Sequence, residues 1–143
     1  MTDYTFIDAD AHVEECEETW SYLDPEFQSR RPIAVTLPNA PSRGNLNSFW
    51  LVDGKVLPTP VGPGASVFAT PTSCILGGQK SFSRGSQEMT DVGARLRDMD
   101  AWAIDLQVVF PTVFLSSPSD DPRFEAALYR SYNSWMAETC RQA

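Results

Sequence analysis

The chain is poor in the residues that build many cofactor and disulfide sites. Its 143 residues include one histidine, His12, and three cysteines that lie far apart and form no C-x-x-C pair. An odd number of widely spaced cysteines argues against a disulfide framework or a structural zinc site. The same pattern fits a reducing compartment, so the sequence predicts a cytoplasmic protein whose fold depends on neither feature.

Positive charge is also scarce. Only Lys55 and Lys80 are lysines, the nine arginines are scattered, and the formal net charge is −8. Binding to nucleic acid or to anionic lipid requires a cluster of basic side chains, which this sequence does not have. There is no apolar run of membrane-spanning length and no basic-plus-apolar leader at the start. We therefore expect neither nucleic acid nor a membrane as a partner.

What the chain does have is enough apolar material for one packed domain. Apolar residues make up 42% of the sequence and aromatic residues 11%, which favours a folded chain over a disordered one. Glycine is concentrated in the middle, because all eight glycines lie between Gly44 and Gly93. Repeated glycine and proline predict loops and turns, so we expect an irregular insertion over about residues 33–89.

One hairpin is readable inside this insertion. Asp53-Gly54 separates two β-prone segments, residues 49–52 and 55–57. An Asp-Gly pair in this position predicts a type I′ turn, since both central residues of that turn need positive φ. We expect the hairpin to stop at Pro58.

Strands and helices alternate outside the insertion. The predicted elements are a strand at 5–9, a short acidic helix at 15–23, a helix capped at Thr90 or Asp91, a strand at 106–110 and a helix from Asp121. The near-continuous apolar run at 106–110 is typical of a parallel strand covered on both faces. The alternation predicts βαβ units and an α/β fold.

The first strand leads into Asp8-Ala9-Asp10-Ala11-His12. Side chains alternate along a strand, so Asp8, Asp10 and His12 are expected to point to one side. A carboxylate oxygen and an imidazole nitrogen are both zinc ligands, and a carboxylate also suits manganese. By itself, a D-x-H pair is more often a solvated turn than a ligand pair, and the chain has no second histidine to complete a shell.

Four segments follow one another in an order typical of one enzyme family. Residues 7–15 (IDADAHVEE) contain the acid–histidine pair, and residues 95–100 (RLRDMD) precede the second predicted strand. Residues 103–112 (AIDLQVVFPT) form that strand, and residues 127–140 contain the YNSW sequence of the last helix. Together these segments resemble the N-terminal part of the amidohydrolase-2 family of metal-dependent hydrolases, which includes aminocarboxymuconate-semialdehyde decarboxylase.

The resemblance implies a partial (β/α)8 TIM barrel over residues 1–143, with the first two barrel strands and helices and the insertion. It implies that Asp10 and His12 are metal ligands, for zinc or manganese, and that Asp8 orients a neighbour or caps the strand. The implied reaction is hydrolysis or non-oxidative decarboxylation of a small, aromatic or carboxylated substrate. A complete barrel takes about 250 residues, so we expect the isolated chain to lack a complete active site, and no catalytic residue is assigned.

A second hypothesis belongs to another class of protein. The chain is then a non-catalytic remnant that binds a second copy, or a C-terminal companion chain, through an uncovered apolar edge. Neighbours of the acid–histidine pair have structural interpretations as well. Glu14 and Glu15 are expected at a solvated helix start, Arg95 and Arg97 on an exposed helix surface, and Thr112 at a hydrogen-bonded strand end.

Overall fold

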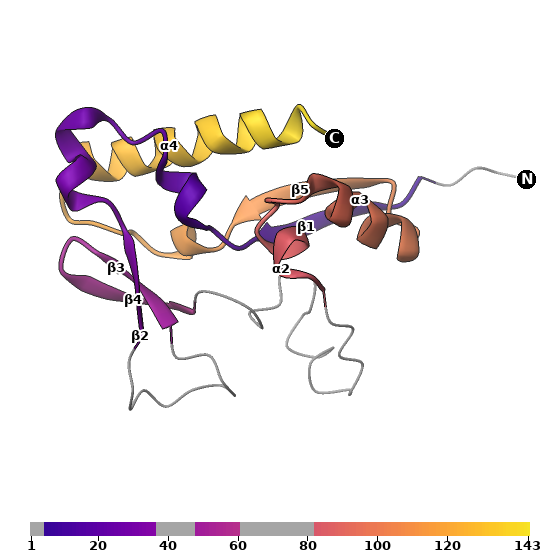
Figure 1. The fold of residues 1–143 in the computed structure, drawn as a ribbon, viewed down its shortest axis with the longest axis horizontal. Helices are drawn as coiled ribbons and strands as arrows, with labels where there is room; N and C mark the ends of the chain where they lie inside the picture. The colour runs from indigo at the N-terminus through magenta and orange to yellow at the C-terminus, as the bar shows by residue number, and fades with distance from the viewer. Residues whose placement is uncertain (1–4, 37–47, 61–81) are drawn as a thin grey trace, which may run out of the picture.

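The described residues form two small β-sheets. The computed structural model describes residues 5–36, 48–60 and 82–143, so most of the loops predicted for the insertion lie outside the described residues. The first sheet is the parallel pair of β1 (Ile7–Val13) and β5 (Leu106–Pro111). The second is antiparallel in the order β2 (Ile33–Thr36), β3 (Ser48–Val52) and β4 (Lys55–Pro60). Figure 1 shows it beyond one end of the β1–β5 pair.

Helices connect and flank these sheets. α2 (Arg84–Gln87) and α3 (Val92–Ala101) precede β5, and α4 (Pro122–Cys140) follows it. Short 3-10 helices η1 (Glu17–Trp20), η2 (Pro25–Arg30) and η3 (Val113–Leu115) fill the connections. Among the described residues, none of the helices is long and apolar enough to cross a bilayer. The α/β class predicted from the alternation is confirmed.

Two aspartates start the longer helices as the sequence predicts. The Asp91 side chain accepts a hydrogen bond from the Ala94 amide at 2.8 Å, and Asp121 accepts one from the Arg123 amide at 3.0 Å. Each bond satisfies an amide that the first helical turn leaves unpaired. The short acidic helix predicted at 15–23 is confirmed in part, because it forms as the 3-10 helix η1 and covers only Glu17–Trp20.

The hairpin is confirmed in type and extended in length. Asp53 and Gly54 have φ values of 51° and 78°, as a type I′ turn requires. β4 continues to Pro60 instead of stopping at Pro58. Trp50 of β3 is buried and packs edge-on against Trp20 at 5.5 Å between ring centroids. The hairpin thus belongs to the larger hydrophobic core, which also contains the start of α4.

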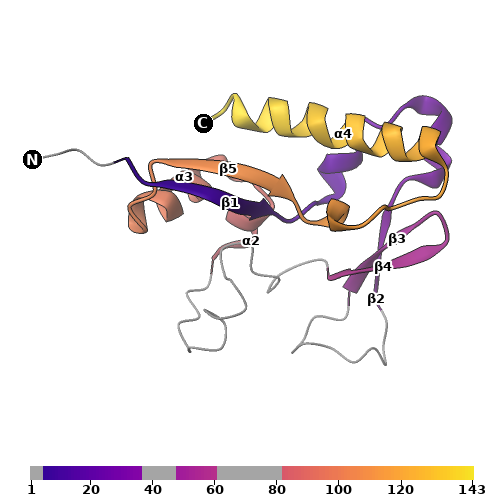
Figure 2. The same ribbon diagram turned by 180° about the vertical axis from the view of Figure 1, so that it is seen from behind.

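The β1–β5 pair has one covered face and one open face. Ala11, Val13 and Val109 face the covered side, where Tyr132 and Trp135 of α4 pack. The open face carries exposed apolar side chains: Ile7, Leu106, Val108 and Phe110. Figure 2 looks onto this side, with α3 behind the strands. The prediction that residues 106–110 are covered on both faces is therefore wrong for the part of the protein that the structure describes.

Candidate metal-binding site

Asp10 and His12 lie together on the open face of the β1–β5 pair. The Oδ1 atom of Asp10 is 3.7 Å from Nε2 of His12, and the two side chains are 89% and 24% exposed. Two ligands about 2.1 Å from a tetrahedral zinc ion are about 3.4 Å apart, so the pair is spaced to share one ion. Over residues 5–36, 48–60 and 82–143, however, no three His, Cys, Asp or Glu side chains form a metal-holding group.

Asp8 does not join the pair. β1 has one residue more than β5 between two paired positions, since Asp8 pairs with Gln107 and Ala11 pairs with Val109. This bulge breaks the alternation on which the sequence prediction rested. The Asp8 carboxylate accepts hydrogen bonds from Nε2 of Gln107 at 3.0 Å and from the Asp10 amide at 3.2 Å. These bonds tie Asp8 to β5 and to the backbone of Asp10.

Arg95 is a buried hub behind the pair, and its predicted exposure is wrong. Its side chain is 2% exposed. It donates hydrogen bonds to the carbonyl oxygen of His12 at 3.1 Å, to Oε1 of Gln107 at 2.8 Å and to the carbonyl oxygen of Ser86 at 3.3 Å. Burial lowers the pKa of Arg95 to about 10, against the nearby charges of Asp8 and Asp98. Arg97, by contrast, is exposed as predicted.

One residue of the sequence, Gln107, indicates a buried polar contact at this place. Gln107 is the one polar residue in the apolar strand 106–110. A polar side chain in such a strand needs a buried partner. Arg95 lies three residues after the buried Val92, on the same side of α3. Gln107 thus indicates a buried polar partner without identifying it, whereas the charge of Arg95 favours an exposed surface.

Glu15 ties the end of β1 to the end of β5. Its buried carboxylate accepts hydrogen bonds from the amides of Thr112 at 2.8 Å and Val113 at 3.0 Å. Burial raises the pKa of Glu15 to about 7, although these amide donors act in the opposite direction. The Thr112 hydroxyl donates to the carbonyl oxygen of Val13 at 2.6 Å and lies 3.5 Å from Nδ1 of His12.

Glu14 is buried as well, so the predicted solvated helix start is wrong for both glutamates. It is 3% exposed, and neither of its carboxylate oxygens has a hydrogen-bond partner among the described residues. Burial, reinforced by the nearby charges of Glu88 and Glu15, raises the pKa of Glu14 to about 8. Its backbone amide donates to the carbonyl oxygen of Gln87 at 3.0 Å, which holds the end of β1 against α2.

Other reactive groups do not extend the site. Burial raises the pKa of Cys16 to about 12, so its thiol stays protonated at neutral pH.

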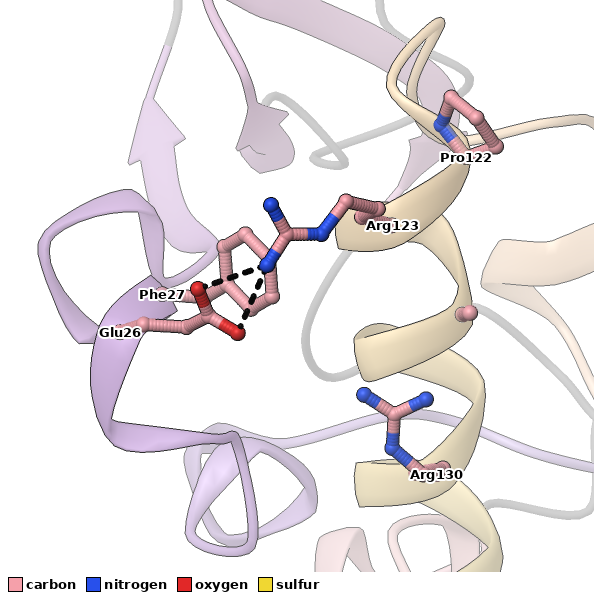
Figure 3. Close-up of a pocket in the computed structure, with 6 residues that line it drawn as sticks. Glu26, Phe27, Pro122, Arg123 and Arg130 are labelled. Carbon is pink, nitrogen blue, oxygen red and sulfur yellow. Dashed lines mark hydrogen bonds and ion pairs between the residues drawn. The ribbon is translucent and has the colours of Figure 1, made fainter.

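A pocket of about 320 Å³ lies between η2 and the start of α4. Figure 3 shows Glu26 bridged to Arg123 across it. The second guanidinium that lines the pocket belongs to Arg130, which is paired with Asp24. Both cationic side chains of the pocket are therefore already paired with acids.

Comparison with known proteins gives a structural neighbour. No protein-family model matches the chain, and no curated protein matches it. The structure is similar to the crystal structure of an amidohydrolase from Mycobacterium avium subsp. paratuberculosis, with a TM-score of 0.53 and 19% sequence identity. The match covers 97% of this chain and 39% of that chain, so this chain spans about two fifths of the neighbour's length. The fold of this chain is therefore amidohydrolase-like.

Proposed function

We propose that this chain supplies the first-strand metal ligands of an amidohydrolase-like hydrolase or non-oxidative decarboxylase. The observation that carries the proposal is the 3.7 Å separation of Asp10 Oδ1 and His12 Nε2 on the open face of β1 and β5. The amidohydrolase-like fold supports it. Enzymes built on (β/α)8 barrels place their sites at the carboxyl ends of the strands, and His12 lies one residue before the end of β1.

The donor set suits a divalent ion. Asp10 would supply an anionic oxygen and His12 a neutral imidazole nitrogen, which favours zinc first and manganese second. When bound, such an ion polarises a carbonyl or carboxylate oxygen of the substrate, here proposed to be small and aromatic or carboxylated. The chain's own contribution is rigidity, because Arg95 holds the His12 carbonyl and Asp8 holds the Asp10 amide.

Zinc titration of the chain tests the proposal. We expect weak, saturable binding of one ion, because two ligands fill only half of a tetrahedral shell. His12→Ala should abolish the binding and Asp10→Asn should weaken it at least about tenfold. Glu17→Gln is the control for loss of an acid, since Glu17 is 56% exposed and lies in η1, outside the β1–β5 pair. Equal losses in Asp10→Asn and Glu17→Gln, or binding that survives His12→Ala, would contradict the ligand assignment.

Tight binding would contradict a different part of the proposal. Stoichiometric zinc at low micromolar affinity, lost in His12→Ala, would mean that the chain already holds a complete shell. Completion would then come from a second copy of the chain or from residues outside 5–36, 48–60 and 82–143, because the described residues of one copy form no group of three ligands. A manganese titration under the same conditions decides which ion is preferred.

The open face favours a second candidate function, self-association of the chain. Ile7, Leu106, Val108 and Phe110 are 57%, 47%, 43% and 43% exposed, and they lie on neighbouring positions of two paired strands. In a barrel, the inward-facing side chains of the strands fill the interior in layers. A contiguous apolar surface left open in water is an association site, and we propose a second copy of the chain as its occupant.

Sedimentation velocity over a range of concentrations tests self-association. The wild-type chain should sediment faster as its concentration rises, and Val108→Lys should remain monomeric. Leu115→Lys is the control, because Leu115 is 72% exposed but lies in η3, outside the β1–β5 pair. A wild-type chain that stays monomeric would remove this candidate and leave the metal proposal intact.

A further inference from the structure

Thr112 lies where it can control the imidazole of His12. His12 pairs with Phe110 across the sheet, and Val13 pairs with Pro111, so Thr112 follows directly after the last paired residue of β5. Its hydroxyl oxygen is 3.5 Å from Nδ1 of His12 and 2.6 Å from the carbonyl oxygen of Val13. The nitrogen on the other side of the ring, Nε2, is the one near Asp10.

The two distances define the direction of each hydrogen bond. A threonine hydroxyl has one proton to donate and two lone pairs that accept. The carbonyl oxygen of Val13 can only accept, and its short distance assigns the proton to that bond. Toward His12, the hydroxyl oxygen is therefore left with its lone pairs. It can interact favourably with Nδ1 only if that nitrogen carries a proton.

From this geometry we propose that Thr112 is a positioning residue that favours the Nδ1–H form of neutral His12, against the nearby Asp10 carboxylate, which favours a proton on Nε2. A histidine that binds a metal commonly donates its other ring N–H to a neighbouring oxygen, which fixes the tautomer and the ring orientation. The value of this arrangement for metal binding rests on the proposed function. The tautomer itself does not, because it is a property of the metal-free chain.

Thr112 is rigid enough for this task. The Glu15 carboxylate accepts hydrogen bonds from the Thr112 and Val113 amides at 2.8 and 3.0 Å. Glu15 is 3% exposed, and Val113 is 1% exposed. From the other direction, Arg95 binds the His12 carbonyl. The backbones of both partners are therefore fixed by buried groups, and their side chains meet at a defined position.

The single histidine makes the proposal directly measurable. In chain labelled with ¹⁵N, the ring nitrogens of His12 are the only imidazole signals, and their shifts report which nitrogen is protonated. The measurement is made near pH 9, so that the two neutral forms are compared. The wild-type chain should show a substantial population of the Nδ1–H form. Thr112→Val should shift the population toward Nε2–H, and Thr112→Ser, which restores a hydroxyl, should return it to Nδ1–H.

Zinc titration of the same samples separates this inference from the proposed function. Thr112→Val should lower zinc affinity about tenfold or more, with recovery in Thr112→Ser. A wild-type chain in the Nε2–H form, or a Thr112→Val chain with an unchanged tautomer, overturns the inference even if zinc binds. A wild-type Nδ1–H form that is lost in Thr112→Val and recovered in Thr112→Ser, in a chain that binds no zinc, upholds the positioning role and overturns the proposed function.

Discussion

Nη2 of Arg95 donates a hydrogen bond to the carbonyl oxygen of His12 at 3.1 Å, so helix α3 holds the backbone of the candidate metal ligand. Arg95 forms hydrogen bonds with residues of three elements, β1, β5 and α2. The Arg95 guanidinium therefore connects α3 to both strands of the β1–β5 pair, and its removal should lower the stability of the whole fold.

We expect Arg95→Met to lower the free energy of unfolding by about 3 kcal/mol. The change leaves the His12 carbonyl and the Gln107 amide oxygen without their buried donor, and each such loss costs about 1–3 kcal/mol. Urea unfolding monitored by tryptophan fluorescence measures the effect. Arg97→Met on the same helix is the control. Arg97 is 71% exposed, so its loss should cost less than about 0.5 kcal/mol. Equal losses of stability in the two variants would contradict the structural role of Arg95.

The wild-type chain should become less stable as pH rises through neutrality. In the folded protein the pKa of Glu14 is raised from 4.5 to about 8, so the folded state binds this proton more tightly than the unfolded state does. Its contribution to stability is fully present below about pH 4.5 and is lost as pH rises through about 8. Glu15, raised from 4.5 to about 7, acts in the same direction over a narrower range.

Glu14→Gln isolates this effect. The variant keeps the shape and remains neutral, so it should match wild type at pH 4.5 and exceed it by about 2 kcal/mol or more at pH 8.5, given about 1.4 kcal/mol per pKa unit. Urea midpoints across this pH range test the prediction. Glu17→Gln should follow the wild-type curve, because Glu17 is 56% exposed. A Glu14→Gln curve parallel to wild type would mean that Glu14 titrates normally.

Tyr132→Phe should leave stability unchanged or raise it by up to about 1 kcal/mol. The Tyr132 hydroxyl is buried and has no hydrogen-bond partner in the part of the chain that the structure describes, so its removal should relieve a desolvation cost without breaking a bond. The preceding residue provides the contrast. Ser131 donates to the carbonyl oxygen of Thr19 at 2.7 Å from a fully buried position. Ser131→Ala should therefore cost about 1–2 kcal/mol by thermal or urea unfolding. A larger loss in Tyr132→Phe than in Ser131→Ala would contradict this prediction.

Gly54→Ala should destabilise the hairpin through its backbone alone. The φ value of Gly54 is +78°, and no atom of the described residues lies within 4 Å of the position that a β-carbon would take. The expected cost is therefore the left-handed conformation itself, about 1 kcal/mol. Gly54→Asn should lose less, since asparagine tolerates this region better than other residues with side chains. Unfolding midpoints of the two variants decide the matter, and equal losses would point to a cause other than backbone strain.

Local chemistry explains which parts of the fold were predictable. The Asp-Gly turn and the aspartate caps at Asp91 and Asp121 depend on neighbouring residues only, and all three form as predicted. β2 could not be predicted in the same way, because it is four residues long and is defined by its pairing with β3.

The errors near the candidate site have one physical origin. Charge suggested solvent exposure for Glu14, Glu15 and Arg95, yet all three are buried. Glu15 and Arg95 have buried hydrogen-bond partners distant in sequence, and Glu14 is held in place through its backbone. Tertiary contacts of this kind are invisible to a local pattern. The placement of Asp10 beside His12 agrees with the sequence prediction because it depends on a spacing of two within one extended segment.

The bulge in β1 places Asp8 and Asp10, which are two residues apart, in different environments. Asp8 is bound to the sheet through Gln107, so a change there disturbs folding before it can alter chemistry. The Asp10 side chain is 89% exposed and has no hydrogen bond comparable to that of Asp8 within the described residues, so its replacement should leave the strand intact. One extra residue in a strand thus separates an acid that the sheet holds from an acid that the sheet leaves free.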